Sequence, residues 1–560
     1  MIVRQKSLSF RAQSTALSFR AKRGIPTLLL CFVLFSTALA QTGGELRFCI
    51  RAEPKTFDPL LVDDDAGLPI RYLTGGVLAR INRHTQELEP ELAESWKVSP
   101  DSRQITFKLR HGVHFSDGTP FAAEDVAFTV QRLMDPAVHS PVGDAFRTGP
   151  GPVATKVIAA DQISITFPAA IVGLDRQFDQ VAIMSAHSPQ KERAVLGPFM
   201  VAEYKPGSSV RLERNPYFWK KDSQGRRLPY LDSIHLDIQS NRDVELLRFK
   251  RGELDLINSL DTEYFDRLGS TSPQLVHDAG PSLDSDFMWF NQVANAPIPE
   301  YKRAWFRSAN FRRALSEAIN RDDIVRIVYN GHAQAAVGPV SPANKFWFNA
   351  KLKAEAHNPQ AALDRLKADG FHLQNGVLLD KSNNPVEFSI VTNAGNKARE
   401  RMSVLIQEDL GKIGVKVNLV PLDFPSLIER ISQKFNYEAA MLGFRNIDLD
   451  PNGQMNIWLS SAENHAWNPQ EKSPETAWEA EIDKLMRAQA STADVKKRKA
   501  AFDRVQEIVY EQAPILYLVN QNALSAVSTS VAGASPGILY PQTFWNADHL
   551  TITGTASARR

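Results

Sequence analysis

The chain has 560 residues, which is more than one hydrophobic core usually organises, so two or more domains are expected. Its composition, 43% hydrophobic and 23% charged, is that of an ordinary globular protein. The 65 basic and 63 acidic residues nearly balance, and this charge does not favour a nucleic-acid-binding protein.

The N-terminus departs from this pattern. Residues 1–24 carry six basic residues and no acidic one, and an apolar run, 28–35, precedes the small-residue sequence Ala38-Leu39-Ala40. These are the parts of a secretory signal peptide, and the apolar run is too short to cross a membrane as a helix. We therefore expect residues 1–40 to be a signal peptide; the alternative is a buried N-terminal helix. Removal of the six basic residues leaves 59 against 63 acidic ones, a net charge of about −4.

The two cysteines favour an exported protein without a lipid anchor. Cys31 lies in the apolar run and is lost with the signal peptide, so Cys49 has no partner for an intramolecular disulfide. Neither cysteine follows a small residue, as a lipid-modified cysteine does. We expect a periplasmic protein that is soluble rather than lipid-anchored, with no transmembrane segment after the signal peptide.

The first half of the mature chain alternates strands and turns. Alternating patterns predict strands at 44–51, 105–110 and 163–167, and two prolines predict a loop at 53–59. A hairpin is expected at 111–120, followed by a helix that begins near Ala123 with acidic residues in its first turn.

The second half mixes longer helices with apolar strands, so the class is mixed α/β. Helical spacing predicts helices at 311–318, 321–328, 398–413, 479–490 and 496–510, the second of them capped by Asn320. Apolar runs predict strands at 415–419, 439–444 and 515–519.

Common catalytic and metal motifs are missing from the sequence. There is no G-x-S-x-G elbow, H-E-x-x-H, Walker A loop or C-x-x-C. His111 and His114 are three residues apart, but their place in a hairpin favours exposed histidines over a metal pair. Residues 63–65 are three aspartates without the spaced ligands of a calcium loop, which indicates a solvated turn. We therefore expect no catalytic residues, no metal and no cofactor.

Four groups of motifs run in order along almost the whole mature chain. They are EPKTFDP at 53–59; LEPELAESW at 88–96 with LRHGVHFSDGTP at 109–120 and AEDV at 123–126; GPF at 197–199 with LERNPYFW at 212–219 and PYLD at 229–232; and FRRAL at 311–315 with AINR at 318–321. Together they resemble the family 5 extracellular solute-binding proteins, the dipeptide- and oligopeptide-binding group.

This resemblance implies a two-lobed clamshell of the periplasmic-binding-protein type, type II-like, with discontinuous lobes and an extra subdomain. By the same resemblance, the core of lobe I takes 44–87, 197–290 and 515–560, the subdomain takes 88–196, and lobe II takes 291–514. The segment Trp289-Phe290-Asn291 resembles the family's crossing between the lobes, and the chain is expected to return near Pro514.

The resemblance also implies where a ligand would bind. The family's ammonium-binding aspartate lies in a loop after a strand, and here that loop matches 443–452. Aligning Asp450-Pro451 to the family's Asp-Pro places the ammonium position on Ile447, so Asp448 is one residue away from it and closer than Asp450. Arg445 offers a partner for a ligand carboxylate. The alternative for Asp450 is a turn aspartate before proline.

Two further segments are expected near the ligand. The loop Leu60–Gly67 corresponds to one that approaches the ligand backbone in relatives, and the Trp-rich stretch with Trp458, His465 and Trp467 either lines pockets or packs in the core. The ligand-binding residues predicted from all these segments are Gly443, Phe444, Arg445, Asp448, Asp450, Asp65 and Trp467.

The function implied is that of a monomeric binding protein that captures a peptide or peptide-like solute and passes it to the permease subunits of an ABC importer, with no role for nucleic acid. Related proteins take nickel chelates, haem, opines or oligosaccharides, so a non-peptide solute is the alternative ligand. A secreted hydrolase and a sensor that signals through a membrane partner are the alternative functions.

Overall fold

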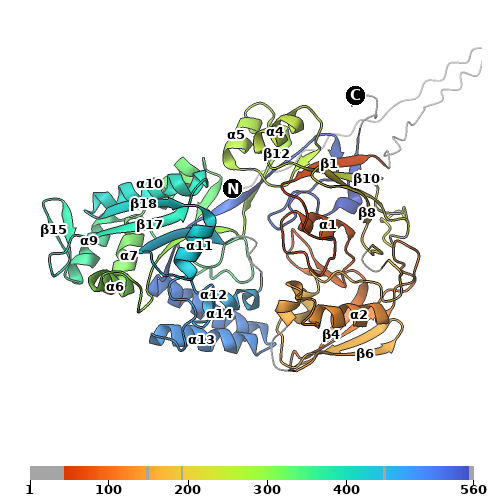
Figure 1. Cartoon of the computed structure of the whole chain (residues 1–560), viewed down its shortest axis with the longest axis horizontal. Coiled ribbons are helices and arrows are strands. Elements are labelled where there is room, and N and C mark those ends of the chain that lie inside the picture. Colours follow the sequence, from red (N-terminus) through yellow and green to blue (C-terminus); the bar gives the residue numbers. More distant parts are fainter. Residues whose placement is uncertain (1–42, 147–150, 191–192, 445–448, 554–560) are drawn as a thin grey trace, which may run out of the picture. The chain divides into compact units, whose positions relative to one another are not determined.

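A computed structural model describes residues 43–146, 151–190, 193–444 and 449–553. The predicted signal peptide, 1–40, lies outside the described residues. The rest belongs to one compact unit, 42–560, in which strands and helices alternate (Figure 1). Among the helices of the described ranges, none combines the length and apolar character needed to cross a membrane.

A four-stranded sheet contains the first strand of the mature chain. Its order is β1-β10-β9-β8, and the strands are β1 (Glu45–Ile50), β10 (Ser233–Ile238), β9 (Ser209–Arg214) and β8 (Phe199–Lys205). β1 and β10 pair in parallel although 188 residues separate Glu45 from its partner Ser233. Alternate residues of β1, such as Leu46 and Phe48, are buried in one hydrophobic core with Leu236.

A second four-stranded sheet is antiparallel and lies between these segments in sequence. Its order is β4-β5-β7-β6, with β4 (Ala93–Val98), β5 (Gln104–Leu109), β7 (Gln162–Thr166) and β6 (Ala154–Ala159). Helix α2 (Ala123–Met134) packs on it and buries Val126 and Val130. Asp125 closes a capping interaction at the start of α2, because its carboxylate accepts the backbone N–H of Ala122 at 2.8 Å.

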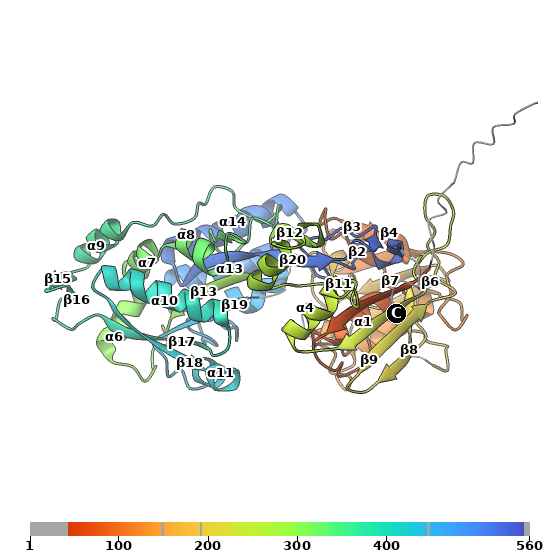
Figure 2. The ribbon, with the colours of Figure 1, turned by 90° about the horizontal axis from the view of Figure 1, so that it is seen from above.

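The largest sheet has eight strands, and β20 (Ile515–Val527) is the longest of them and pairs with four others. The sheet also holds β11 (Leu256–Ile257), β12 (Val276–Pro281), β13 (Ser285–Phe290), β14 (Ala333–Ala335), β17 (Glu387–Asn393), β18 (Lys416–Leu422) and β19 (Ala439–Phe444). β20 pairs first with β13, then with β14 and β12, and finally with β11, and Figure 2 shows it extending past these strands. Its first residues therefore enter one hydrophobic core and its last residue, Val527, enters another.

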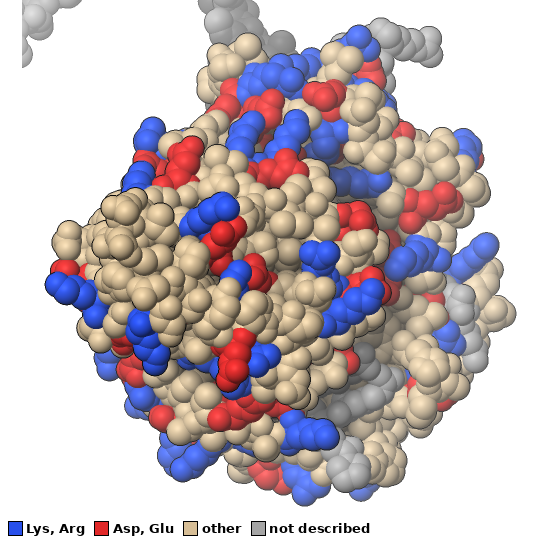
Figure 3. Space-filling view, turned by 60° about the vertical axis from the view of Figure 1, so that its left-hand side comes forward, with Lys and Arg blue, Asp and Glu red and all other residues tan. Residues whose placement is uncertain are grey.

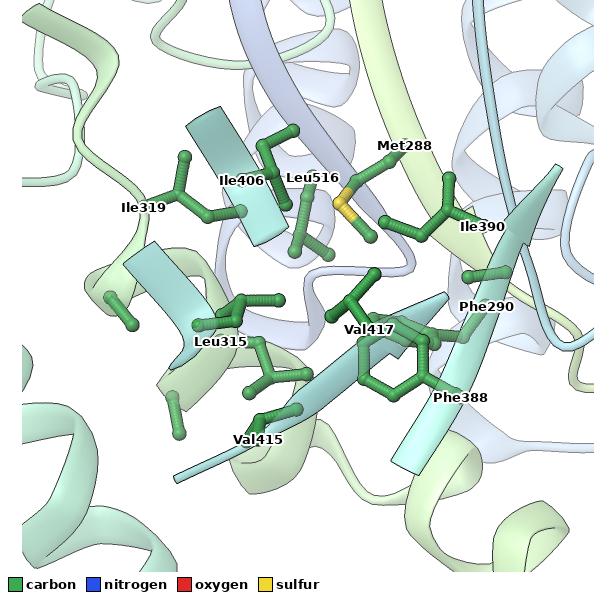
Figure 4. Packing of buried hydrophobic residues seen from close by; sticks show 14 of the residues in the cluster. Met288, Phe290, Leu315, Ile319, Phe388, Ile390, Ile406, Val415, Val417 and Leu516 are labelled. Atoms are coloured by element: carbon green, nitrogen blue, oxygen red, sulfur yellow. The ribbon is translucent and has the colours of Figure 1, made fainter. Parts of the chain in front are cut away.

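The core around β13, β17 and β18 is tightly packed. Met288 and Phe290 of β13, Phe388 and Ile390 of β17 and Leu315 of a neighbouring helix belong to one cluster of buried side chains (Figure 4). These side chains are almost fully buried, and burial of apolar surface is the main driving force for folding.

The remaining elements are helices and three small two-stranded sheets. These sheets are β2 (Ala79–Ile81) with β3 (Leu88–Pro90), β15 (His372–Gln374) with β16 (Val377–Leu379), and β21 (Val531–Ala532) with β22 (Thr551–Ile552). The α-helices are α1 (Gly67–Thr74), α3 (Leu174–Gln177), α4 (Arg242–Lys250), α5 (Thr262–Gly269), α6 (Glu300–Arg307), α7 (Ala309–Ala318), α8 (Arg321–Asp323), α9 (Pro359–Ala368), α10 (Lys397–Lys412), α11 (Phe424–Ser432), α12 (Met455–Trp458), α13 (Ala477–Ala490) and α14 (Val495–Gln512).

Most of the predicted elements are confirmed within a few residues, including β1, β5, β7, β19, α2, α7, α10, α13 and α14. Two differ. The helix predicted at 321–328 is a short α-helix, α8, followed by a π-helical turn, although Asn320 caps it as expected. The strand predicted at 515–519 continues to Val527, because its pairing partners change along its length.

Acidic and basic side chains are intermixed over the face shown in Figure 3. No broad area of one charge appears on that face, as expected for a chain whose basic and acidic residues nearly balance.

Candidate functional site

A cavity of about 310 Å³ brings together segments that are far apart in sequence. It is lined from 68–83 (α1 and β2), 179–182, 282–284 (the approach to β13), Leu449 and 538–542. This volume is at the lower end of the range for sites that take small ligands. The lining is both apolar and polar, which suits a ligand that has both characters.

Three arginines give the cavity its chemical character. Arg71, Arg80 and Arg83 line it together with two carboxylates, Asp179 and Asp284. The guanidinium groups outnumber the carboxylates, and arginine stays protonated in proteins. The cavity therefore favours a ligand that carries a negative charge.

Arg83 and Arg80 already have partners. Arg83 forms an ion pair with Asp179 at 3.2 Å (Nη2–Oδ2), and Asp179 also accepts the backbone N–H of Ile81 at 2.8 Å. Arg80 lies over the ring of Tyr72, 4.4 Å from its centroid, and this cation–π contact fixes its direction. These two arginines are thus held in place before any ligand binds.

Arg71 differs because no hydrogen bond or ion pair holds its guanidinium among the described residues. It lies in the last turn of α1 and is partly buried. Burial lowers its pKa, and the Asp179 carboxylate opposes this effect. Even partial burial of a cation without a partner is costly, so Arg71 is the group in this cavity best placed to bind a ligand carboxylate.

Tyr540 is a second polar group at this end of the cavity. Burial, and after it the negative charge of Asp65, raise the pKa of the Tyr540 phenol, while Arg71 opposes the shift. The phenol is therefore a neutral donor at physiological pH. The predicted residue Asp65 is exposed and does not line the cavity, but it acts electrostatically on a residue that does.

The predicted loop 443–452 reaches the edge of this cavity. Leu449 contributes to the lining, whereas Gly443 and Phe444 at the end of β19 do not. Phe444 packs on Phe287 with ring centroids 4.5 Å apart. Arg445 and Asp448 lie outside the described residues, so their predicted contacts with a ligand stay predictions.

Gly443 is required by the close approach of two strands. It pairs with Asp286 of β13, and a Cβ atom at 443 would lie 2.4 Å from the Asp286 carboxylate and 2.7 Å from Arg399. Asp286 and Arg399 form a buried ion pair at 3.0 Å, and Tyr329 donates to the same carboxylate at 2.8 Å. Gly443 thus makes room for a charged network next to the predicted ligand loop.

Asp450 has a partner within the protein. Its carboxylate accepts two hydrogen bonds from the Arg498 guanidinium, with Nη1–Oδ2 at 2.9 Å and Nη2–Oδ1 at 2.5 Å. Both residues are 3% exposed. The same carboxylate accepts the backbone N–H of Asn452 at 2.9 Å, which makes Asp450 the cap of the following 3-10 turn. This geometry supports the turn alternative for Asp450, and its contact with a ligand ammonium stays a prediction.

Trp467 lies in the hydrophobic core with Trp458 and has no exposed surface. Its indole N–H donates to Glu479 at 2.9 Å, and its ring packs against His465 with centroids 3.9 Å apart. The arrangement supports the packing alternative for this stretch, and direct contact of Trp467 with a ligand stays a prediction.

Comparison with known proteins identifies the family. The family model for bacterial extracellular solute-binding proteins, family 5, matches residues 87–466. The chain belongs to this family. The match extends from the second four-stranded sheet, through the loop at the cavity edge, to the Trp-rich stretch.

Relatives of this family 5 protein match over nearly its whole length. A probable ABC transporter-binding protein of Deinococcus radiodurans is 28% identical, over 88% of this chain and 89% of the relative. The oligopeptide-binding protein AppA of Bacillus subtilis is 24% identical, over 89% of this chain and 90% of the relative. The solved structure of the ABC transporter substrate-binding protein CtaP of Listeria monocytogenes has a TM-score of 0.75 at 24% identity and covers 92% of this chain and 100% of its own. The expected family and its mixed α/β binding-protein fold are confirmed.

Sequence reasoning missed the three cavity arginines of this family 5 chain. It had pointed to the loop Leu60–Gly67, which ends where α1 begins, but not to Arg71 four residues later. The only signal was three arginines within 71–83, and the sequence does not show that one of them lacks a partner.

Proposed function

We propose that this protein captures a peptide in the described cavity, outside the cytoplasm, and delivers it to the permease subunits of an ABC importer. The observation that carries the proposal is the guanidinium of Arg71, which has no partner among the described residues and lines a cavity rich in arginine. Family membership and the oligopeptide-binding relative from B. subtilis support a peptide as the ligand.

A peptide suits this site because its carboxylates match the arginine groups. Arg71 would bind the C-terminal carboxylate or an acidic side chain through two parallel N–H···O bonds. Arg83 and Arg80 are held by Asp179 and Tyr72, so they would add positive potential without rearrangement. The predicted ammonium partner remains the loop that holds Asp448.

We further propose that residues 1–40 direct export, that the mature protein works as a periplasmic monomer, and that the predicted lobes close over the peptide. The lobes proposed are 44–87, 197–290 and 515–560 for lobe I, with subdomain 88–196, and 291–514 for lobe II. β20, whose two ends enter different cores, supports a hinge between them.

The first experiment identifies the ligand. Native mass spectrometry of freshly purified mature protein should show added masses that denaturation releases and that fragment as peptides. An added mass that fragments as a sugar or a metal chelate would contradict the peptide assignment.

The second experiment tests the role of Arg71 by calorimetry with a peptide found in this way. Arg71→Met should weaken binding by about 30-fold or more, since truncating one partner of a buried charge pair costs about 2–5 kcal/mol. The same peptide with an amidated C-terminus should bind wild type and variant alike, if Arg71 holds the terminal carboxylate.

The matched control is Arg251→Met, which makes the same change at an exposed arginine outside the cavity. It should bind the peptide like the wild type. If folded Arg71→Met binds the peptide as tightly as the wild type, the proposed role of Arg71 is wrong. The peptide assignment would not be affected, because native mass spectrometry tests it separately.

A further inference from the structure

Three chelating side chains meet inside the protein, away from the cavity. His465 and Glu471 lie in the connection between α12 and α13, and Glu479 lies in the first turn of α13. They are 0%, 8% and 3% exposed, and one potential ligand atom from each lies within 4.8 Å of the others. Buried carboxylates and a histidine this close need a partner that balances their charge.

Each of the three side chains is aimed by a second hydrogen bond. His465 donates from Nδ1 to the carbonyl oxygen of Ile457 at 3.0 Å, which leaves Nε2 facing the carboxylates. Glu471 accepts the backbone N–H of Glu475 on Oε2 at 2.8 Å. Thr476 donates its backbone N–H and its hydroxyl to Oε2 of Glu479 at 3.0 and 2.6 Å. The atoms that face one another are therefore Nε2 of His465 and Oε1 of each glutamate.

Two of these converging atoms have no hydrogen-bond partner in the described part of the chain. They are Nε2 of His465 and Oε1 of Glu471, both buried, while Oε1 of Glu479 accepts the Trp467 indole N–H. An unsatisfied buried acceptor is costly, so native proteins seldom keep two of them side by side. These atoms therefore point to a bound group between them.

The spacing fits metal ligands better than a hydrogen bond. Nε2 of His465 lies 3.6 Å from Oε1 of Glu471 and 3.7 Å from Oε1 of Glu479. A hydrogen bond would bring these atoms to about 2.9 Å. Two ligands of one tetrahedral zinc ion, each about 2.0–2.1 Å from the metal, lie about 3.4 Å apart.

We propose that His465, Glu471 and Glu479 form a site for a divalent transition-metal ion, best matched by Zn²⁺. One neutral imidazole and two carboxylates are typical zinc ligands, and two carboxylates balance the charge of a dication. The Nδ1–H bond of His465 to a carbonyl is the outer contact that metal-binding histidines usually make.

The site would stabilise the connection that leads from α12 to α13. That connection also holds Trp467, whose carbonyl oxygen accepts the backbone N–H of Gln292, two residues after β13. A metal ion would thus fasten this loop to the helix that follows it and, through Trp467, to the large sheet. This role is structural, and it does not depend on the identity of the transported solute.

The test measures metal content and stability on the mature protein. Protein freed of metal by a chelator in mild denaturant and returned to buffer should take up one zinc ion per chain by elemental analysis, and its Tm should rise by several degrees. Co²⁺ in place of Zn²⁺ should give the strong visible absorption of a tetrahedral site. Less than one-tenth of a metal ion per chain, or no change in Tm, would overturn the proposal.

Two variants separate this site from surface binding. Glu471→Gln should lose the bound zinc and the Co²⁺ absorption, whereas Glu475→Gln, whose side chain faces Arg307 instead, should keep both. Retention of zinc by Glu471→Gln would overturn the site. If Glu471→Gln does not fold, the metal content and Tm of the wild type still decide.

Discussion

Replacement of Asp450 tests whether this carboxylate serves the fold or a ligand. Asp450→Asn leaves the Arg498 guanidinium buried without a counter-charge. Breaking a buried ion pair by removing one partner costs about 3–5 kcal/mol. Here the asparagine oxygen can still accept one N–H, and Arg498 keeps Gln489 and the ring of Trp347 as partners. We therefore expect a loss near the lower end, about 3 kcal/mol.

Urea unfolding followed by circular dichroism measures this loss. The matched control is Asp503→Asn on the same helix as Arg498, where a partly exposed aspartate pairs with Lys499. That control should cost less than about 1 kcal/mol, the usual scale for surface pairs. The double variant Asp450→Asn with Arg498→Met should recover part of the loss, because it removes the uncompensated buried charge.

Ligand binding by the folded Asp450→Asn protein decides between the two roles. If the carboxylate serves the fold, calorimetry should show peptide affinity within about 0.5 kcal/mol of wild type. Unchanged stability combined with affinity reduced by about 30-fold or more would refute the structural role and assign Asp450 to the ligand ammonium.

The remaining predictions concern the strand before the loop and the pH dependence of stability. Gly443→Ala should destabilise the protein by about 1–3 kcal/mol in the same unfolding assay, because the new Cβ would overlap the Asp286–Arg399 pair; wild-type stability would contradict this. The bond from His235 to Asp237, at 3.2 Å, raises the pKa of His235 above 6.5. The stabilisation that this bond gives the folded protein is complete below pH 6.5 and is lost as the pH rises through the raised pKa of His235. Tm should therefore fall toward about pH 8.5 more in wild type than in His235→Gln. Parallel pH profiles would contradict the pairing.

The sequence alone determined the local elements and the family. Helices such as α10 and α14 follow from apolar residues repeated at helical spacing, and β19 follows from a short apolar run. The prediction of Asn320 as a cap also succeeded, because capping depends on neighbours only a few residues away. The motifs that identify the family lie within short windows for the same reason.

Only the tertiary structure decided which side chains meet. Asp450 could be recognised as a turn residue, but its partner Arg498 lies 48 residues away. Arg71 became a candidate ligand group only when segments from 68 to 542 formed one cavity and gave it no partner among the residues that the structure describes. Hydrophobic periodicity and helix caps depend on residues within one or two helical turns. Whether a charged side chain finds a partner depends instead on residues that are distant in sequence and adjacent in the fold.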